Sequence, residues 1–398
     1  MNKIRILSLD GGGMRGIITA RLLLEVEKYL GAPLNQHFNL IAGTSTGSLL
    51  AAGLAIGMRV QDLIDLYKNE GTVIFPYRGR FHLKRLPVLL EHGVSAPKFS
   101  NDGLIRTVKK HIGYDAQGNI RYLSDVVPQN RMSRLVITSY DTHSRNAIVF
   151  KSWRKGKWYN SDTVVDSETG EKNHLALWEA CVSSASAPTF LPPVRIDAAL
   201  DDGTLHEYSL IDGGVCANNP TACAVAEAIR LLCDPNPDNE PGFDSRRRVA
   251  AQTPAQALQN IKVLSIGTGD VTDKMLWNTV RKWGLVKWGL RISDVLMDAP
   301  SDVHDYVSRQ IISDPYPQDG VDTQYLRLQL DRHTLERLDR DSLSVNMDDA
   351  RPKSLQLLEN VAALYLQEKA VAAQVVEGWQ SVYSNLDVVK LYLDALYR

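Results

Sequence analysis

Two apolar runs that each end in glycines and lead into a helix-like segment constrain the fold most strongly. Residues 4–9 (IRILSL) run into DGGG, and residues 39–42 (NLIA) run into GTSTG. Apolar residues at helical spacing follow the first junction, and small residues follow the second. Strands that are apolar along their whole length are buried on both faces. The order strand–helix–strand–helix therefore predicts a parallel sheet covered by helices on each side.

Further strands are predicted at four places, before the pattern becomes mainly helical after about residue 269. These strands cover residues 134–141, 146–153, 207–214 and 261–269. We therefore expect an α/β fold of three layers, α/β/α, with a mainly parallel central sheet. The main domain is expected over residues 1–270, with a mainly helical C-terminal region, 271–398, packed on it as a candidate lid, membrane element or regulatory element.

The composition excludes several classes of protein. The formal net charge of the 398 residues is −1, which argues against a nucleic-acid polymer as partner. The four cysteines show no C-x-x-C pair and no zinc-like Cys/His spacing, so we expect no metal site and reduced thiols. The N-terminus lacks a signal-peptide pattern, and no apolar run approaches the ~20 residues of a membrane span. These features predict a cytoplasmic protein that meets any membrane from the water side.

Ser45 is the candidate nucleophile, at the centre of Gly43-Thr44-Ser45-Thr46-Gly47. A G-x-S-x-G sequence between a strand and a helix forms a tight turn that lifts the serine hydroxyl clear of the sheet. Gly43 and Gly47 support this turn by leaving room on both sides of it. The N-terminus of the following helix favours negative charge nearby. An ordinary helix cap is the alternative interpretation.

The glycine loop after the first strand allows two interpretations. Gly11, Gly13 and Gly16 fit G-x-G-x-x-G, which would make the chain a nucleotide-binding regulatory protein or an oxidoreductase. That fingerprint expects an acid at the end of the second strand, and the sequence has none between residues 39 and 57. In the second interpretation Gly11, Gly12 and Gly13 turn their N–H groups toward one point as an oxyanion hole. Arg15 then adds charge or locks the loop, and Gly16 supports it.

A serine nucleophile needs a base, and none of the nine histidines lies in a distinctive strand-end context. Asp212 follows a predicted strand and precedes Gly213 and Gly214, which would support its turn. Parallel strands present their carboxyl ends to the same crevice, so we expect the Asp212 carboxylate to reach Ser45. A turn-forming Asp-Gly is the alternative.

Together, DGGGMRG, GTSTG and DGG resemble the patatin-like phospholipase family. The blocks SSASAPTFLPP (183–193) and IKVLSIGTG (261–269) also fit, so the resemblance covers roughly residues 4–270, the expected catalytic domain. It implies a serine–aspartate dyad that hydrolyses fatty-acyl esters of membrane glycerophospholipids. Ser45 would be the nucleophile, Asp212 the base, and Gly11, Gly12 and Gly13 with Arg15 the oxyanion loop. It implies no metal and no cofactor, and the sequence has no calcium-loop pattern.

Bacterial members of this family include anti-phage effectors that cyclic oligonucleotides switch on to degrade the membrane of their own cell. The short lead into the glycine loop, the chain length and the lack of a secretion signal resemble that subgroup. This resemblance implies a membrane phospholipid substrate, a cyclic di- or trinucleotide activator and a homo-oligomer. It also implies a cytoplasmic protein that associates peripherally with the inner face of the membrane when active.

The segment 275–296 (MLWNTVRKWGLVKWGLRISDVL) combines three tryptophans with basic residues. Trp277 and Trp288 are eleven residues apart, which would place them on one face of a helix. Tryptophan with Lys and Arg is typical of an interfacial amphipathic helix. Packing on the catalytic domain and a lid over the acyl pocket are the other two interpretations, and Gly284 weakens any single continuous helix.

Overall fold

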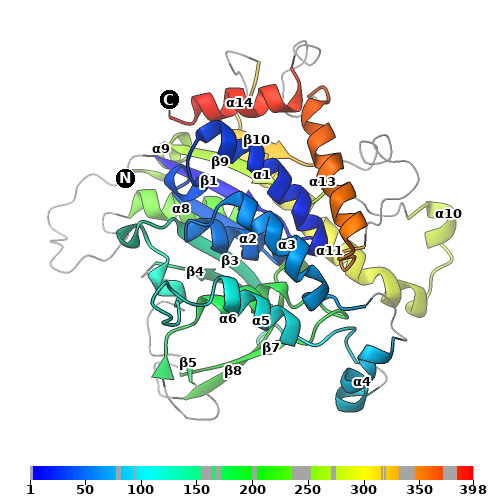
Figure 1. Ribbon diagram of the computed structural model, residues 1–398. Coiled ribbons are helices and arrows are strands. Elements are labelled where there is room, and N and C mark those ends of the chain that lie inside the picture. Colours follow the sequence, from blue (N-terminus) through cyan, green and yellow to red (C-terminus); the bar gives the residue numbers. More distant parts are fainter. Residues whose placement is uncertain are drawn as a thin grey trace.

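A ten-stranded sheet forms the middle layer of the structure (Figure 1). The computed structural model describes residues 3–77, 82–93, 96–153, 164–165, 172–199, 204–234, 252–269, 275–314, 317, 320–330, 346–370 and 383–397. The strands are β1 (Ile4–Leu9), β2 (Leu40–Thr44), β3 (Arg134–Asp141), β4 (Asn146–Lys151), β5 (Val164–Val165), β6 (Lys172–Asn173), β7 (Val194–Ala199), β8 (Leu205–Asp212), β9 (Ile261–Ile266) and β10 (Tyr325–Leu328).

The sheet has a parallel core and an antiparallel flank. Strands β10, β9, β1, β2 and β3 are parallel neighbours in that order. Strands β4 and β8 both pair with β3 in antiparallel fashion, and β7, β5 and β6 continue beyond β8. The predicted α/β fold with a mainly parallel central sheet is therefore confirmed, with antiparallel strands at one side.

Helices cover both faces of the sheet (Figure 1). They are α1 (Gly16–Leu30), α2 (Thr46–Ala55), α3 (Val60–Ile74), α4 (Leu86–His92), α5 (Asp102–His111), α6 (Leu177–Ala185), α7 (Gly214–Ala217), α8 (Thr221–Cys233), α9 (Pro254–Gln259), α10 (Trp277–Val280), α11 (Leu285–Ile312), α13 (Pro352–Gln367) and α14 (Asn385–Ala395). Alternate residues of β1 separate the two cores. Ile4 and Ile6 pack in the core that contains α8 residues, and Leu7 and Leu9 pack in the core that contains α1 and α2 residues. A mostly apolar strand is what such two-sided burial favours.

The region after residue 270 is mainly helical but also adds a strand to the sheet. β10 pairs in parallel with β9, from Tyr325 opposite Val263 to Leu328 opposite Ile266. Helices α13 and α14 lie against α1, and α11 lies against α7 and α8. The C-terminal region thus completes the sheet edge and covers parts of both faces, which the helical pattern alone did not predict.

The tryptophan segment departs from two expectations. Trp277 lies in α10 and Trp288 in α11, so the two do not share one helical face, because the chain turns at residues 281–284. The interpretation that the tryptophans pack on the catalytic domain does not hold for Trp277, which is 71% exposed, whereas Trp288 is 37% exposed. None of the helices in the described part of the chain has the length and apolar character needed to cross a bilayer.

Candidate active site

Ser45 sits at the turn between β2 and α2 in a backbone conformation that few non-glycine residues adopt. Its φ is 54° and its ψ −126°, a strained combination that aims the side chain away from both elements. Two hydrogen bonds hold this turn: the Ser45 N–H donates to Ser184 Oγ at 2.8 Å, and the Ser48 hydroxyl donates to the Ser45 carbonyl at 2.6 Å. The side chain is nearly buried, with 6% of the residue exposed.

Asp212 reaches Ser45 by a route that the sequence did not predict. We expected two parallel strands that end in the same crevice, but β8 runs antiparallel to β3. The register shows how the two ends meet: Thr44 pairs with Thr138 of β3, and Asp212 pairs with the next residue, Ser139. β2 and β8 therefore lie end to end along the same side of β3, and their last residues face each other.

Ser45 and Asp212 form a direct, buried hydrogen bond. The Ser45 hydroxyl donates to Asp212 Oδ2 at 2.6 Å, and the Gly214 N–H donates to Asp212 Oδ1 at 2.7 Å. Burial raises the pKa of Asp212 to about 7, and these two hydrogen bonds, which favour the charged form, oppose that rise. Among the described histidines, none hydrogen-bonds to Ser45. The site therefore combines a serine hydroxyl with an aspartate whose pKa lies near neutral pH, which suits a general base.

The glycine loop lies beside this pair, and its hydrogen bonds separate the candidate oxyanion donors. The Gly11 N–H donates to the Asn218 carbonyl at 3.1 Å, and the Met14 N–H donates to the Met347 carbonyl at 2.7 Å. No hydrogen bond to another described residue engages the N–H of Gly12 or Gly13. Of the three glycines named from the sequence, these two are the ones whose N–H groups have no hydrogen-bond partner among the described residues.

Arg15 braces the glycine loop. Its Nε donates to the Gly12 carbonyl at 3.4 Å, and its Nη1 donates to the Gly269 carbonyl at 3.3 Å. The two bonds tie the loop to the chain segment that follows β9. Of the two roles that the sequence allowed for Arg15, this geometry favours locking the loop over adding charge at the reacting atom.

Comparison with known proteins decides the family. The family model described as patatin-like phospholipase matches residues 7–225, more than half of the chain. The chain belongs to the patatin-like phospholipase family. Patatin-like protein 3 of Arabidopsis thaliana is 27% identical over 411 residues, which cover 96% of this chain and 85% of that protein. Patatin-15 of Solanum tuberosum is 24% identical over 383 residues, which cover 92% and 84%.

Two solved structures show distant likeness to this patatin-like chain. Human GIVD cytosolic phospholipase A2 aligns with a TM-score of 0.41 and 10% identity, over 99% of this chain and 61% of that one. VipD from Legionella pneumophila aligns with a TM-score of 0.31 and 12% identity, over 90% and 67%. Membership of the patatin-like phospholipase family makes the chain a lipid acyl hydrolase.

The glycines of the patatin-like motifs are fixed by close packing. A Cβ atom added to any of them would come within 2.1 to 2.5 Å of a neighbouring atom. These glycines are Gly11, Gly12, Gly13, Gly16, Gly43, Gly47, Gly213 and Gly214. At Gly43 the obstacle is the Gly47 carbonyl oxygen at 2.1 Å, across the turn, and at Gly47 it is the Leu9 carbonyl oxygen of β1 at 2.2 Å.

Several residues that hold the patatin-like site were not named from the sequence. The SSASAP block, which begins in α6, holds both the Ser45 turn and the turn after Asp212. The Ser184 hydroxyl accepts a hydrogen bond from the Ser45 N–H at 2.8 Å, and the Ser184 carbonyl accepts one from the Gly213 N–H at 3.2 Å. Thr268, in the other secondary block, donates to the Gly11 carbonyl at 2.8 Å. The resemblance to the family pointed to the blocks 183–193 and 261–269, but only the tertiary contacts show that Ser184 and Thr268 hold the backbone of the site.

A buried ion pair fixes the start of the glycine loop. Arg327 of β10 donates from Nη1 to Asp10 Oδ1 at 2.9 Å and from Nη2 to Asp10 Oδ2 at 2.5 Å. Asp10 is 2% exposed and Arg327 7%. Burial raises the pKa of Asp10, and the Arg327 guanidinium opposes the rise. We regard Asp10 as ionised, because both of its oxygens accept hydrogen bonds from a guanidinium that stays charged. β10 therefore supplies Arg327, whose ion pair with Asp10 holds the start of the glycine loop.

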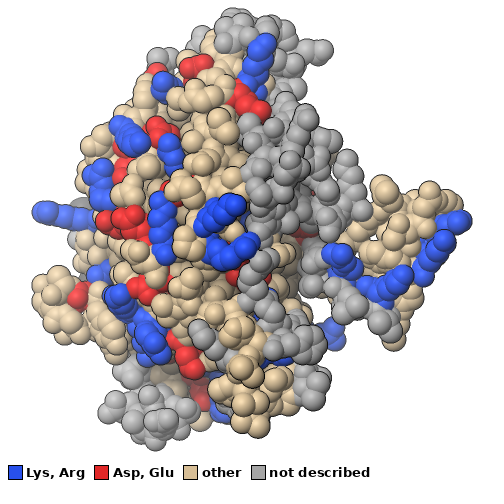
Figure 2. All heavy atoms as spheres, turned by 45° about the vertical axis from the view of Figure 1, so that its right-hand side comes forward, with Lys and Arg blue, Asp and Glu red and all other residues tan. Residues whose placement is uncertain are grey.

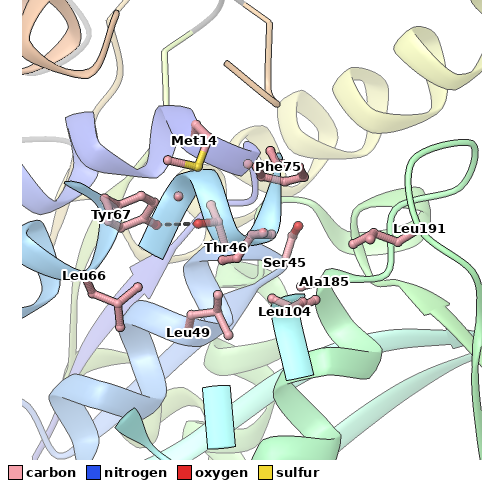
Figure 3. A pocket seen from close by; sticks show the side chains of 13 residues that line it. Met14, Ser45, Thr46, Leu49, Leu66, Tyr67, Phe75, Leu104, Ala185 and Leu191 are labelled. Atoms are coloured by element: carbon pink, nitrogen blue, oxygen red, sulfur yellow. Dashed lines mark hydrogen bonds between the residues drawn. The ribbon is translucent and has the colours of Figure 1, made fainter. Parts of the chain in front are cut away.

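An apolar pocket opens beside Ser45 (Figure 3). Its open space, which includes the solvent at its mouth, is about 480 Å³. It is lined by Gly13, Met14, Ser45, Thr46, Leu49, Leu66, Tyr67, Gly71, Ile74, Phe75, Leu104, Ala185 and Leu191. The hydroxyls of Thr46 and Tyr67 hydrogen-bond to each other, so they are not presented singly to a ligand. The pocket suits an alkyl chain whose reactive end lies at Ser45.

The remaining site expectations concern metals and dinucleotides. Among the described residues, no group of three or more His, Cys, Asp and Glu side chains is placed to hold a metal ion. At the end of β2, where a dinucleotide fold would place an acid, the chain places Ser45. The carboxylate nearest in sequence to the glycine loop, Asp10, is already held by Arg327. This arrangement does not offer the ribose contact that the dinucleotide interpretation needs.

Proposed function

We propose that this protein hydrolyses fatty-acyl esters of membrane glycerophospholipids, with Ser45 as nucleophile and Asp212 as base. The observation that carries the proposal is the 2.6 Å hydrogen bond from the Ser45 hydroxyl to the buried Asp212 carboxylate, at the end of an apolar pocket. A nucleophile bonded to its base, next to two open backbone N–H groups, is the arrangement that acyl transfer requires.

The first step forms an acyl-enzyme. Ser45 Oγ attacks the ester carbonyl carbon while its proton passes to Asp212 Oδ2. The carbonyl oxygen becomes an oxyanion, which the N–H groups of Gly12 and Gly13 stabilise. When the intermediate collapses, the bond to the lipid alcohol breaks. The leaving lysolipid takes the proton from Asp212, which restores the carboxylate.

The second step releases the fatty acid. Water attacks the acyl carbon of the Ser45 ester and gives its proton to Asp212, and the same two N–H groups stabilise the new oxyanion. Collapse breaks the bond to Ser45 Oγ, which recovers its proton from Asp212. The fatty acid leaves, and the two steps together consume one water for each ester.

The buried position of Asp212 supports its role as base. An ordinary aspartate is a weak base, because its pKa lies about 3 below neutrality. Burial brings the pKa of Asp212 to about 7, so its carboxylate binds a proton more tightly while a substantial fraction of it is ionised near neutral pH. A single carboxylate can then accept the proton of an attacking hydroxyl without a histidine between them.

The test is release of fatty acid from phospholipid vesicles. We expect Ser45→Ala to abolish release and Asp212→Asn to lower it at least a thousandfold, whereas Ser100→Ala, at a serine before α5, retains it. A fluorophosphonate probe should label Ser45, as located by mass spectrometry of the labelled peptide. Undiminished release by Ser45→Ala, with probe label on another residue, would overturn the assignment.

The resemblance to anti-phage effectors adds a second, separable proposal. Activation by a cyclic di- or trinucleotide and assembly into a homo-oligomer stay predictions of that resemblance. They are tested by fatty-acid release with and without a panel of cyclic di- and trinucleotides, and by light scattering of the same mixtures. Equal release and equal mass in all mixtures would refute both. The hydrolase proposal stands or falls on the Ser45 variants alone.

A further inference from the structure

Helix α10 and the first turns of α11 project from the body of the protein (Figure 1). Several large apolar side chains in this part are exposed. We call residues 276–292 the basic lobe. Its exposed apolar residues, with the exposed fraction of each, are Leu276 (63%), Trp277 (71%), Leu285 (90%), Trp288 (37%) and Ile292 (42%). Soluble proteins rarely expose such side chains in a group unless the group meets a partner.

The charge of the basic lobe differs sharply from that of the whole chain. Residues 276–292 contain Arg281, Lys282, Lys287 and Arg291 and no acidic residue, whereas the chain as a whole has a net charge of −1. In Figure 2 the lobe projects at the right, with Lys and Arg side chains among uncharged atoms. The next acid along the chain is Asp294, which marks the end of the purely basic stretch.

The basic lobe is an ordered unit on a helix that is anchored at the catalytic site. The Arg281 guanidinium lies 4.8 Å from the centre of the Trp277 ring, and Trp283 meets Trp288 edge to face at 5.4 Å. Further along α11, Met297 is packed against Gly214, since a Cβ there would lie 2.5 Å from its Cε. Helix α11 thus connects Trp288 to the turn that carries Asp212.

We propose that the basic lobe docks this protein on the surface of a bilayer that contains anionic phospholipids. The inference rests on the proposed function, because it names the surface from which the substrate is taken. Tryptophan and leucine side chains insert at the level of the headgroups, and the basic side chains meet the anionic phosphates. Each Lys or Arg at such a surface strengthens binding by roughly fivefold.

The position of the basic lobe fits this role. β1 begins on the side of the N-terminus, at the left of Figure 1, and β2 runs parallel to it toward Ser45, whereas α10 projects at the right. The lobe therefore extends from the side toward which the parallel strands run and where the nucleophile lies. Docking there would present the catalytic edge of the sheet to the bilayer.

A lipid surface explains the lobe better than a protein partner does. Leu285, Trp288 and Ile292 are spaced by three and four residues, so they form one apolar ridge on α11. Lys287 and Arg291 are the neighbours of that ridge in sequence and flank it. Exposed apolar side chains flanked only by basic side chains match an anionic bilayer, because its apolar interior lies beneath a layer of negatively charged headgroups.

The experiment measures vesicle binding in the Ser45→Ala background, so that lipid breakdown does not alter the vesicles. We expect co-sedimentation with phosphatidylglycerol-containing vesicles, weaker binding to pure phosphatidylcholine, and loss of the difference at high salt. Trp277→Ala with Leu285→Ala should weaken binding at least tenfold. Lys282→Gln with Lys287→Gln should weaken it only on the anionic vesicles.

Two matched controls lie outside the basic lobe. Leu205→Ala removes a leucine that is 65% exposed at the start of β8, and Lys369→Gln removes an exposed charge after α13. Both should bind as the Ser45→Ala parent does. Lobe variants that bind like the parent would overturn the docking proposal. So would lobe variants that split an oligomer of the lipid-free protein, because the lobe would then be a contact between copies.

The outcomes also separate docking from the proposed hydrolysis. If the protein with Ser45 binds vesicles but releases no fatty acid either alone or with any of the cyclic di- and trinucleotides, the hydrolase proposal fails and docking stands. If the lobe variants in the Ser45 protein bind vesicles and release fatty acid as the parent does, docking fails and the hydrolase proposal stands.

Discussion

The replacement Asp212→Asn tests the central electrostatic claim through stability, independently of catalysis. Burial raises the pKa of Asp212 from 3.8 to about 7. This rise corresponds to about 4 kcal/mol, the extra free energy of holding the carboxylate charged in the folded protein. An asparagine of the same shape does not titrate, so it removes that cost without opening a cavity.

The sign follows from the proton balance. The unfolded chain releases the Asp212 proton near pH 3.8 and the folded protein near pH 7, so the folded state binds the extra proton between these values. The contribution of Asp212 to stability is complete below pH 3.8 and is lost as the pH rises through 7. Between pH 5 and pH 8 the wild-type protein should therefore lose about 3 kcal/mol relative to Asp212→Asn.

The assay is urea denaturation of both proteins, followed by tryptophan fluorescence, at several pH values from 5 to 8. Lost hydrogen bonds at residue 212 give a constant offset, so only the change with pH is diagnostic. Asp387→Asn is the matched control: hydrogen bonds from Ser384 lower the pKa of Asp387, which is ionised in both states above pH 5. A stability difference for Asp212→Asn that stays constant across this range would refute the claim.

Three further predictions follow from the same geometry. The kcat/KM for a monomeric ester should rise about tenfold per pH unit up to about pH 7 and then level off, because Asp212 acts as a base only when ionised; a flat profile from pH 5 to 9 would contradict this. Gly43→Ala should cost several kcal/mol of stability in urea denaturation or prevent folding, because its Cβ would lie 2.1 Å from a backbone oxygen of α2. The control Gly31→Ala should cost about 1 kcal/mol, because its Cβ would meet no atom within 4 Å and only its φ of +73° is unfavourable for alanine. Arg327→Met should destabilise the protein by about 3–5 kcal/mol because Asp10 stays buried without its partner; adding Asp10→Asn should recover part of that loss, and a purely additive double variant would argue against the pairing.

The local chemistry of the site could be predicted from the sequence because the motifs make local demands. A strand that enters G-x-S-x-G can continue into a helix only through a strained turn, and the structure has that turn at Ser45 with a φ of 54°. The strand at residues 4–9 and the strand at residues 134–141 were predicted with the bounds that the structure has. Both are runs rich in apolar and β-branched residues, and the pattern predicted their limits.

The pairing of Ser45 with Asp212 was expected for the wrong geometric reason. Whether β8 runs parallel or antiparallel depends on which neighbour it finds in the sheet, and the residues of β8 do not encode that choice by themselves. The same holds for β10, a four-residue strand inside a largely helical region, which is stabilised by its pairing with β9. Short strands owe their existence to their neighbours, which a local pattern does not contain.

By itself the sequence determined which groups are available: a serine in a G-x-S-x-G turn, an aspartate before two glycines, and a glycine loop that carries backbone N–H donors. The tertiary structure decided how these groups behave. It buried Asp212, and so set its proton affinity; it tied Gly11 to Asn218, and so left two donors; and it left Trp277 in solvent instead of in the core. The physical reason is that residue identity is local, whereas desolvation and hydrogen-bond competition depend on every element packed around a group.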